Sequence, residues 1–297
     1  MTETGLFKRF RDSLLFLSLC LFPSASAFAE LEIHAELSSA QVVDGSIVLI
    51  TVKTPAPDPK ITGTFEESEF SFFASPDRGE GTYEGVMAIP FNHKSGETKV
   101  TIHASAGTDV KNEELTFNIV DGNYPSEALK VDERRVNPRK KDMKRIKREI
   151  KEVHKIYAIS TPHKFWKGPF ELPIQSDVTS QFGTKRMLNG EMQTFHRGLD
   201  LRAKVGTPIH SAAPGKVVLA KSLFFTGNTV LVDHGYGIYT LYAHMSRIKV
   251  KLGQEITDHK LIGLSGKTGR VSGPHLHWGA IVQRTQVNPM DLTRVMQ

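Results

Sequence analysis

Apolar and polar residues alternate over several short stretches in the first third of the chain. The alternation is clear in residues 99–104 and 114–120, while residues 46–52 and 83–91 are β-branched or apolar runs. Turn-rich pieces with Pro, Asp, Asn and Gly separate these stretches. Short strands at this spacing predict a small antiparallel, immunoglobulin-like β-sandwich over residues 30–125. This accessory domain is expected to act as a spacer or lid, or to bind a polymer.

A helical period replaces the alternation in the basic segment 126–170, which we expect to be a linker. Asn137 followed by Pro138 predicts the start of a helix that ends before Thr161. Apolar residues then recur every three or four positions, at Met143, Ile146, Ile150, Val153 and Tyr157. We favour an amphipathic helix that docks this stripe on a domain and exposes its charges. The alternative is a helix that lies on an anionic polymer or lipid.

Short strands return in residues 171–297, where Gly and Pro mark the turns. Residues 228–233 and 238–244 predict a hairpin, and strict alternation places His244 on the same face as Tyr242. The segment predicts a mainly antiparallel β domain.

Four histidines and one aspartate in three clusters suggest a metal site in this domain. His275 and His277 share one face of a predicted strand. His196 and Asp200 are four residues apart, a spacing that permits joint coordination on a helix or at a strand edge. The strand edge is favoured by the residues that follow His196: Gly198, Leu199, Leu201 and Ala203. His244 ends the predicted hairpin. A catalytic zinc needs three N or O ligands and an open position, so these five residues suffice for three ligands and two helpers.

The N-terminus reads as a secretory signal over residues 1–29. A basic start precedes an apolar core at residues 14–22, and cleavage is expected after Ala29 or Ala27. The core is short for a permanent span, although an uncleaved anchor is the alternative. Cys20 is the only cysteine, so the mature chain has no disulfide and no thiolate zinc site. We expect export to the periplasm or cell envelope, or secretion, and no stable membrane span after signal removal.

The composition limits the classes of molecule that the protein is expected to bind. The 297 residues carry a formal net charge of +6, which favours polymers with acidic groups. Nucleic acid has no support beyond this charge, and we exclude it as a partner.

Three motif blocks, FHRGLDLRA, LYAHM and GRVSGPHLHWG, closely resemble those of the lysostaphin/LytM-type zinc endopeptidases, metallopeptidase family twenty-three. The resemblance runs from about residue 173 to residue 291. It implies that His196, Asp200 and His277 bind one Zn²⁺ per chain and that His275 is the general acid/base. His244 would position water or stabilise the oxyanion-like intermediate. It further implies a compact antiparallel β fold of the LytM type, like a duplicated hybrid motif, and hydrolysis of peptidoglycan peptides. Apart from the resemblance, we expect a monomer.

Two other functions compete with that of a peptidoglycan endopeptidase. A non-catalytic LytM-like regulator that binds the wall is favoured when ligands are missing, and none is missing here. A general metalloprotease would have to digest proteins. His210, His234 and His259 lie outside the motif blocks and are expected to be surface or packing residues, whereas Asn189 and Arg197 are candidate groove residues.

Overall fold

The computed structural model describes residues 31–130, 138–190 and 192–296. The predicted signal segment, Cys20 and Asn137 lie outside the described residues. Within the described ranges, strands dominate and there are two α-helices, so the predicted mainly β fold is confirmed. Neither helix has the length and apolar character needed to cross a membrane.

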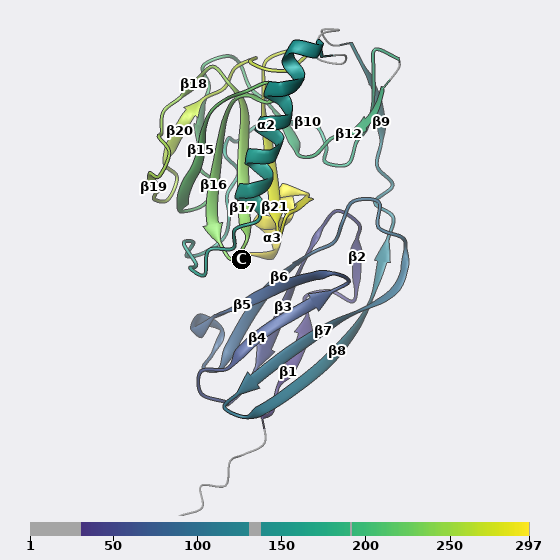
Figure 1. The fold of residues 1–297 in the computed structure, drawn as a ribbon, viewed down its shortest axis with the longest axis vertical. Helices are drawn as coiled ribbons and strands as arrows, with labels where there is room; N and C mark the ends of the chain where they lie inside the picture. The colour runs from purple at the N-terminus through teal and green to yellow at the C-terminus, as the bar shows by residue number, and fades with distance from the viewer. Residues whose placement is uncertain (1–30, 131–137, 191, 297) are drawn as a thin grey trace, which may run out of the picture. The chain divides into compact units, whose positions relative to one another are not determined.

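Eight strands between residues 34 and 120 form one hydrogen-bonded sheet in the order β1-β3-β6-β5-β4-β7-β8-β2 (Figure 1). Their bounds are β1 His34–Leu37, β2 Gln41–Val43, β3 Ile47–Lys53, β4 Lys60–Phe65, β5 Ser68–Ala74, β6 Thr82–Ala88, β7 Gly96–Ala106 and β8 Asp109–Val120, with a 3₁₀ turn at Pro76–Arg78. The four predicted strand stretches fall on β3, β6, β7 and β8. One pair corrects the antiparallel expectation, because β2 and β8 run parallel. These two strands are far apart in sequence, so no tight turn forces them to run antiparallel.

Strand β3 is buried on both faces. Val48 and Ile50 pack with the core that β7 and β8 contribute to this sheet. Ile47 and Leu49 point the other way, into a second core that contains Trp166 and residues of the C-terminal half. Residues 31–297 accordingly form one compact unit. The expected division of the chain at residues 125 and 170 stays a prediction.

Helix α2 spans Lys140–Tyr157 and lies within the segment where the sequence predicts a helix. It begins later than expected. Arg139, with an extended backbone, is the N-cap residue, so Pro138 precedes the helix and is not its first residue. The bulk of the segment before it, residues 131–137, is outside the described part of the chain.

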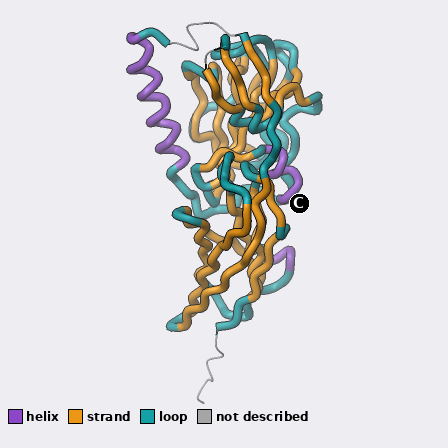
Figure 2. Tube along the Cα trace, turned by 90° about the vertical axis from the view of Figure 1, so that its right-hand side faces the viewer, coloured by secondary structure: helices purple, strands orange, loops and turns teal. Residues whose placement is uncertain are grey.

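The buried face of α2 differs in part from the predicted stripe. Ile146 and Tyr157 are buried, whereas Met143 and Ile150 are 37% and 46% exposed. Glu149 is buried in their place because its carboxylate accepts hydrogen bonds from the Phe224 backbone N–H, at 2.7 Å, and from Arg145. Tyr157 packs with side chains of β15, β16 and β17, so docking, the favoured prediction, is confirmed; Figure 2 shows the long purple helix alongside the strands.

The second large sheet holds the motif blocks. Its order is β10-β13-β21-β17-β16-β15-β19, with β22 paired to β21, and every neighbouring pair is antiparallel. The bounds are β10 Val178–Ser180, β13 Leu199–Arg202, β15 Gly215–Leu223, β16 Gly227–Gly235, β17 Ile238–Met245, β19 Glu255–Ile256, β21 His275–Val282 and β22 Thr285–Val287. The predicted hairpin is present as β16 and β17. Its turn needs glycine at Gly235, where φ is +91° and a Cβ atom would lie 1.5 Å from the His163 carbonyl oxygen.

Two three-stranded sheets complete the C-terminal half. One has the order β14-β20-β18, with bounds Pro208–His210, Leu261–Leu264 and Arg247–Ile248. The other has the order β12-β11-β9, with bounds Met192–Phe195, Lys185–Leu188 and Ser126–Leu129. Strand β9 directly follows the N-terminal sheet in sequence, yet it pairs in parallel with β11. A segment assigned to the linker therefore contributes to the structure around the motif blocks.

Helix α3, Pro289–Val295, closes the described chain, and Asn288 caps it by accepting a hydrogen bond from the Met290 N–H. Asp291, in its first turn, is buried, and one of its carboxylate oxygens has no hydrogen-bond partner among the described residues. Burial raises the pKa of Asp291 to about 6, although Arg294 acts against this shift.

This buried carboxyl group predicts a pH-dependent stability. The folded pKa lies above the unfolded value of about 3.9, so the native state binds the extra proton, and stability falls as pH rises from about 4 to about 6. Asp291→Asn cannot ionise and should raise the melting temperature by a few degrees at pH 7.5, with little change at pH 4. Thermal unfolding at both pH values measures this, with the exposed Asp258→Asn as control. An equal shift at both pH values would contradict the prediction.

Candidate metal centre

Strands β13 and β21 bring one pair of the predicted residues together. Asp200 lies directly opposite His277 in the antiparallel register, so both side chains project from the same face of the sheet. The neighbouring residues on the two strands point to the other face and are buried in the core: Leu199, Leu201, Leu276 and Trp278. Alternation therefore places the polar residues on one face and the apolar residues on the other, as the sequence predicts for the H-x-H segment.

His196 reaches this face from the loop between β12 and β13. Its backbone N–H donates to Thr184 O, which fixes the loop against the turn after β10. Gly198 is required for the close approach of the two segments, since a Cβ atom there would lie 2.5 Å from Trp278 O and 2.7 Å from His277 Cε1. His196 and Asp200 thus meet across a loop–strand junction, and the helical alternative for this spacing is wrong.

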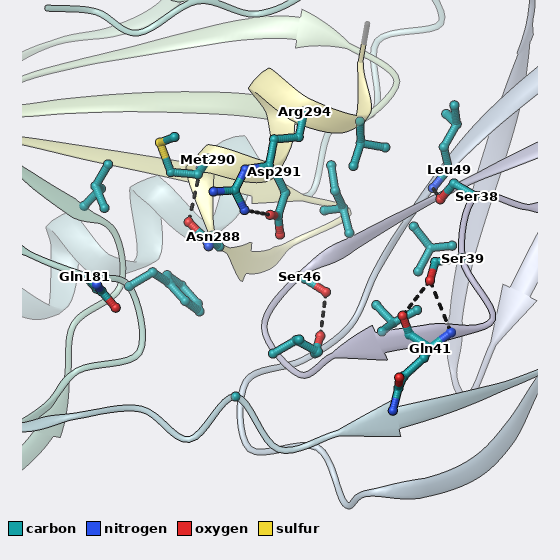
Figure 3. A pocket seen from close by; sticks show the side chains of 18 of the residues that line it. Ser38, Ser39, Gln41, Ser46, Leu49, Gln181, Asn288, Met290, Asp291 and Arg294 are labelled. Carbon is teal, nitrogen blue, oxygen red and sulfur yellow. Dashed lines mark hydrogen bonds and ion pairs between the residues drawn. The ribbon is translucent and has the colours of Figure 1, made fainter. Parts of the chain in front are cut away.

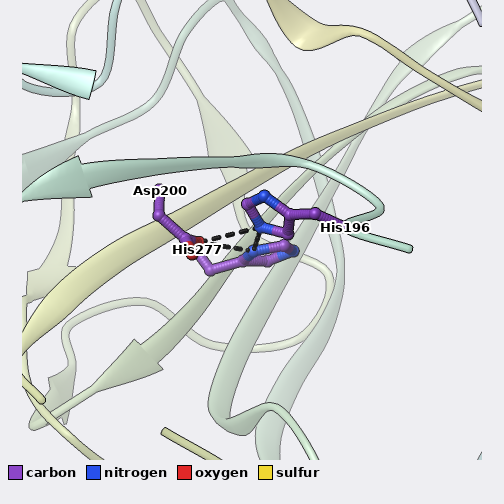
Figure 4. Close-up of side chains that lie close together, drawn as sticks. All are labelled: His196, Asp200 and His277. Atoms are coloured by element: carbon purple, nitrogen blue, oxygen red, sulfur yellow. Dashed lines mark hydrogen bonds and ion pairs between the residues drawn. The ribbon is translucent and has the colours of Figure 1, made fainter. Parts of the chain in front are cut away.

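Three donor atoms converge on one point (Figure 4). His277 Nδ1 lies 2.9 Å from Asp200 Oδ1 and 2.9 Å from His196 Nε2, and His196 Nε2 lies 3.0 Å from Asp200 Oδ1. Ligands at tetrahedral positions around Zn²⁺, with bonds near 2.0 Å, are about 3.3 Å apart. A small outward movement of the three side chains would therefore accommodate such an ion. Two imidazole nitrogens and a carboxylate oxygen are also a donor set suited to zinc.

A ring of outer partners orients these donors. Gln181 O accepts a hydrogen bond from His196 Nδ1 at 2.9 Å, which leaves Nε2 free to face the centre. Arg186 Nη2 donates to the second oxygen of Asp200 at 2.8 Å, and Arg186 Nε donates to Glu127 at 2.6 Å. Arg186 and Glu127 come from β11 and β9, and sequence reasoning missed both. Nothing in the linear sequence marks them, because the pairing of β9 with β11 is a tertiary contact.

His275 and His244 lie beside the three converging residues. His275 Nε2 is 3.5 Å from Asp200 Oδ1, and the ring centroids of His244 and His275 are 4.9 Å apart. Each ring donates Nδ1–H to a backbone carbonyl, His275 to Gly273 O at 2.9 Å and His244 to Thr268 O at 2.8 Å. A carbonyl can only accept, so in the neutral form of each ring Nε2 is the unprotonated acceptor. All five predicted residues are therefore in one cluster.

The predicted face of His244 is wrong. Tyr242 points into the core, whereas His244 lines the same cavity as Leu241. The reason is a β-bulge: the register of β16 and β17 shifts between Val230 and Asn228, and His244 has a φ of +62°. The extra residue turns the side chain to the opposite face of the strand.

Burial and hydrogen bonding shift the ionisation of three of these groups. Burial, with the nearby imidazoles of His277 and His275, lowers the pKa of His244 to about 3. Burial also lowers the pKa of His277. Burial alone would raise the pKa of Asp200, but the adjacent imidazoles of His196 and His277 outweigh it and hold that pKa well below the usual value. At pH 7 Asp200 is thus ionised and His277 is neutral, the states in which they can bind a cation, and His244 is neutral as well.

The cluster lies in a groove of about 560 Å³. Its lining includes side chains from β9, α2 and the 270–272 loop, among them Leu129, Ile150 and Arg270. A larger cavity of about 910 Å³ lies elsewhere, between Ser38–Gln41 and α3 (Figure 3). None of the five predicted residues lines it, so the chemistry belongs to the smaller groove.

The other residues singled out in the sequence differ in whether they line the groove. Arg197 lines the groove as predicted, but Asn189 does not, because it forms the turn between β11 and β12. His234 is a packing residue as predicted: it is fully buried between Pro214 O and Thr240 Oγ1, and burial lowers its pKa to about 4. His210 and His259 face each other outside the groove.

Residues 194–289 match the profile of Peptidase family M23. The peptidoglycan DD-endopeptidase ShyA of Vibrio cholerae is 44% identical over 121 residues, which are 40% of this chain and 28% of ShyA. The DD-carboxypeptidase/endopeptidase Mpg of Neisseria meningitidis is 33% identical over 128 residues, 42% of this chain and 30% of Mpg. The chain therefore matches about a third of the length of these relatives.

A crystal structure from Pseudomonas aeruginosa, described as an M23 peptidase, has a similar fold along most of the chain. It covers 85% of this chain and 95% of its own, with a TM-score of 0.66 and 28% identity. The family profile spans His196, Asp200 and His277. Residues 194–289 thus match peptidase family M23 in sequence, and the fold is similar to that of an M23 peptidase.

Proposed function

We propose that this protein is an exported, zinc-dependent endopeptidase that hydrolyses peptide bonds in bacterial peptidoglycan. The observation that carries the proposal is the convergence of His196 Nε2, Asp200 Oδ1 and His277 Nδ1, within 3.0 Å of one another, in an open groove. The peptidoglycan DD-endopeptidase activity named for ShyA supports the substrate class. The apolar segment at residues 14–22 supports export to the cell envelope.

These three residues would hold one zinc ion. When bound, the ion would polarise the scissile carbonyl and lower the pKa of a water molecule. Arg186 restrains the second oxygen of Asp200, so the carboxylate offers one oxygen to the centre. Gln181 fixes the tautomer of His196. Outer partners of this kind orient ligands and raise metal affinity.

His275 is positioned to act as the general base and then the general acid. Its Nδ1–H is held by Gly273 O, so the unprotonated Nε2 faces the centre and can accept a proton from the attacking water. The same nitrogen can then return the proton to the leaving amine.

Two roles were expected of His244, positioning water and stabilising the oxyanion-like intermediate, and its geometry fits the first better. Its Nδ1–H is committed to Thr268 O and its pKa is far below 7, so Nε2 can accept but not donate a hydrogen bond. An acceptor can orient a water molecule, whereas an oxyanion requires a donor. We therefore assign His244 to water positioning.

Metal removal tests the proposal. Chelation of the purified protein should abolish the release of peptides from purified wall sacs, and stoichiometric Zn²⁺ should restore it. Mass spectrometry of the released products on walls of known chemistry identifies the bond that is cut. Full activity in the metal-free protein would refute the proposal, and wall binding without peptide release would indicate a non-catalytic regulator instead.

Glu127→Gln should weaken metal binding although Glu127 lies outside the matched family region. It removes the charge that holds Arg186 against Asp200, and loss of such an outer partner typically costs about 10- to 100-fold in metal affinity. Competition with a chelator of known affinity measures the change. Glu114→Gln, which breaks an exposed ion pair with Lys99 in the N-terminal sheet, should have no effect. Equal affinities of all three proteins would exclude this role for Glu127.

We also propose the domain organisation expected from the sequence, with an immunoglobulin-like accessory domain at 30–125, a linker at 126–170 and a peptidase domain at 171–297. The eight strands within 34–120 and the position of α2 support it. One refinement is needed, since β9 of the linker pairs with β11 of the peptidase domain.

A further inference from the structure

Arg270 is a positively charged residue of the groove that has no acidic partner among the described residues. It is partly buried, and it lines the groove together with His275 and His277. Its guanidinium carbon lies 4.7 Å from the centroid of the Phe225 ring, and its backbone N–H donates to Phe225 O at 2.7 Å. No acidic side chain in residues 31–130, 138–190 or 192–296 forms an ion pair with it. Stacking on Phe225 therefore fixes the plane of the guanidinium group but does not neutralise its charge.

The groups around Arg270 add to this positive charge and do not neutralise it. Burial and the nearby charges of Arg186 and Arg197 lower the pKa of Arg270. Arg186 is already paired with Glu127 and Asp200, whereas Arg197 is exposed and stacks on Phe195 at 4.9 Å. The carboxylates of the groove are thus committed to Arg186 and the metal ligands. Desolvating a charge without a counterion is costly, so such a group is expected where a ligand supplies the opposite charge.

We propose that Arg270 is a specificity-determining residue that binds a carboxylate of the peptide substrate. This inference rests on the proposed function and defines its substrate class further. The planar fork of a guanidinium group matches the two oxygens of a carboxylate, and a carboxamide cannot replace both contacts. The groove accordingly selects peptides that carry a free carboxyl group close to the scissile bond.

A pair of substrates tests this directly. Synthetic cross-link peptides are prepared with every free carboxyl group intact or with every one converted to a carboxamide. The wild-type protein should cleave the acid form with a kcat/KM about 10- to 100-fold higher, the range of one charge-assisted hydrogen bond, and the difference should lie mainly in KM. Arg270→Gln should lose this preference by weakening cleavage of the acid form alone, and Arg270→Lys should retain part of it. Arg247→Gln, an exposed arginine on β18 outside the groove, should behave as wild type.

Three results would overturn the inference. The wild type would cleave both forms equally, or Arg270→Gln would keep the preference, or Arg270→Gln would slow both forms by the same factor because stacking on Phe225 is purely structural. If Arg270→Gln does not fold, the wild-type comparison and Arg270→Lys still decide. Failure of the wild type to cleave either form would overturn the proposed function, and the inference with it.

Discussion

His277→Ala is expected to lose bound metal and to lose peptide release by more than about 1000-fold, beyond the 10- to 100-fold that loss of an outer partner causes. His277 Nδ1 contacts both other donors at 2.9 Å, so its removal leaves only His196 and Asp200, too few ligands for a catalytic zinc site. The change should leave the fold intact, because the His277 side chain faces the groove and its neighbours Leu276 and Trp278 fill the core. Elemental analysis of the purified variant measures the metal.

The control for this prediction is His259→Ala. His259 is an exposed histidine that pairs with Glu171, away from the groove, so this variant should keep both metal and activity. The assignment of His277 as a ligand would be wrong if His277→Ala retained one equivalent of metal with an unchanged affinity.

His275→Ala is expected to separate metal binding from catalysis. His275 Nε2 is 3.5 Å from Asp200 Oδ1, outside the group of three donors that converge, so the variant should bind metal with near wild-type affinity. It should nevertheless lower kcat by about 10²- to 10⁴-fold, the usual contribution of a general acid/base. Steady-state kinetics together with metal titration measure the two effects.

Loss of metal in His275→Ala would contradict this assignment and would make His275 a ligand. A change in KM with kcat unchanged would also contradict it, because proton transfer acts on the chemical step. Comparison with His277→Ala under the same conditions decides between the two roles.

Local sequence patterns predicted the strands of the site well. The alternation in residues 275–278 places His275 and His277 on one face because the side-chain period of a strand is two, and a well-paired strand such as β21 keeps that period. The hairpin of β16 and β17 was equally predictable, since residues 235–237 take the positive φ values that glycine permits.

The period of two failed at His244, where strand β17 is irregular. The bulge at His244 depends on the two-against-one pairing of β17 with β16, which is a property of both strands and of the loops packed on them. Two features of α2 were also mispredicted. The helix begins at Lys140, after Pro138. Ile150 is exposed because the surface on which the helix docks selects the buried face.

Sequence patterns alone predicted that this chain is mainly β, that five residues in three motif blocks form the candidate centre, and that two histidines of one strand share a face. These features follow from short-range periodicity and from motif identity. Only the folded chain reveals that Glu127 and Arg186 support Asp200, and that Arg270 faces the groove without a carboxylate partner among the described residues. The ion pairs of Arg186 join residues up to 59 positions apart in sequence. Their energies depend on burial and on distance in space, which no local pattern encodes.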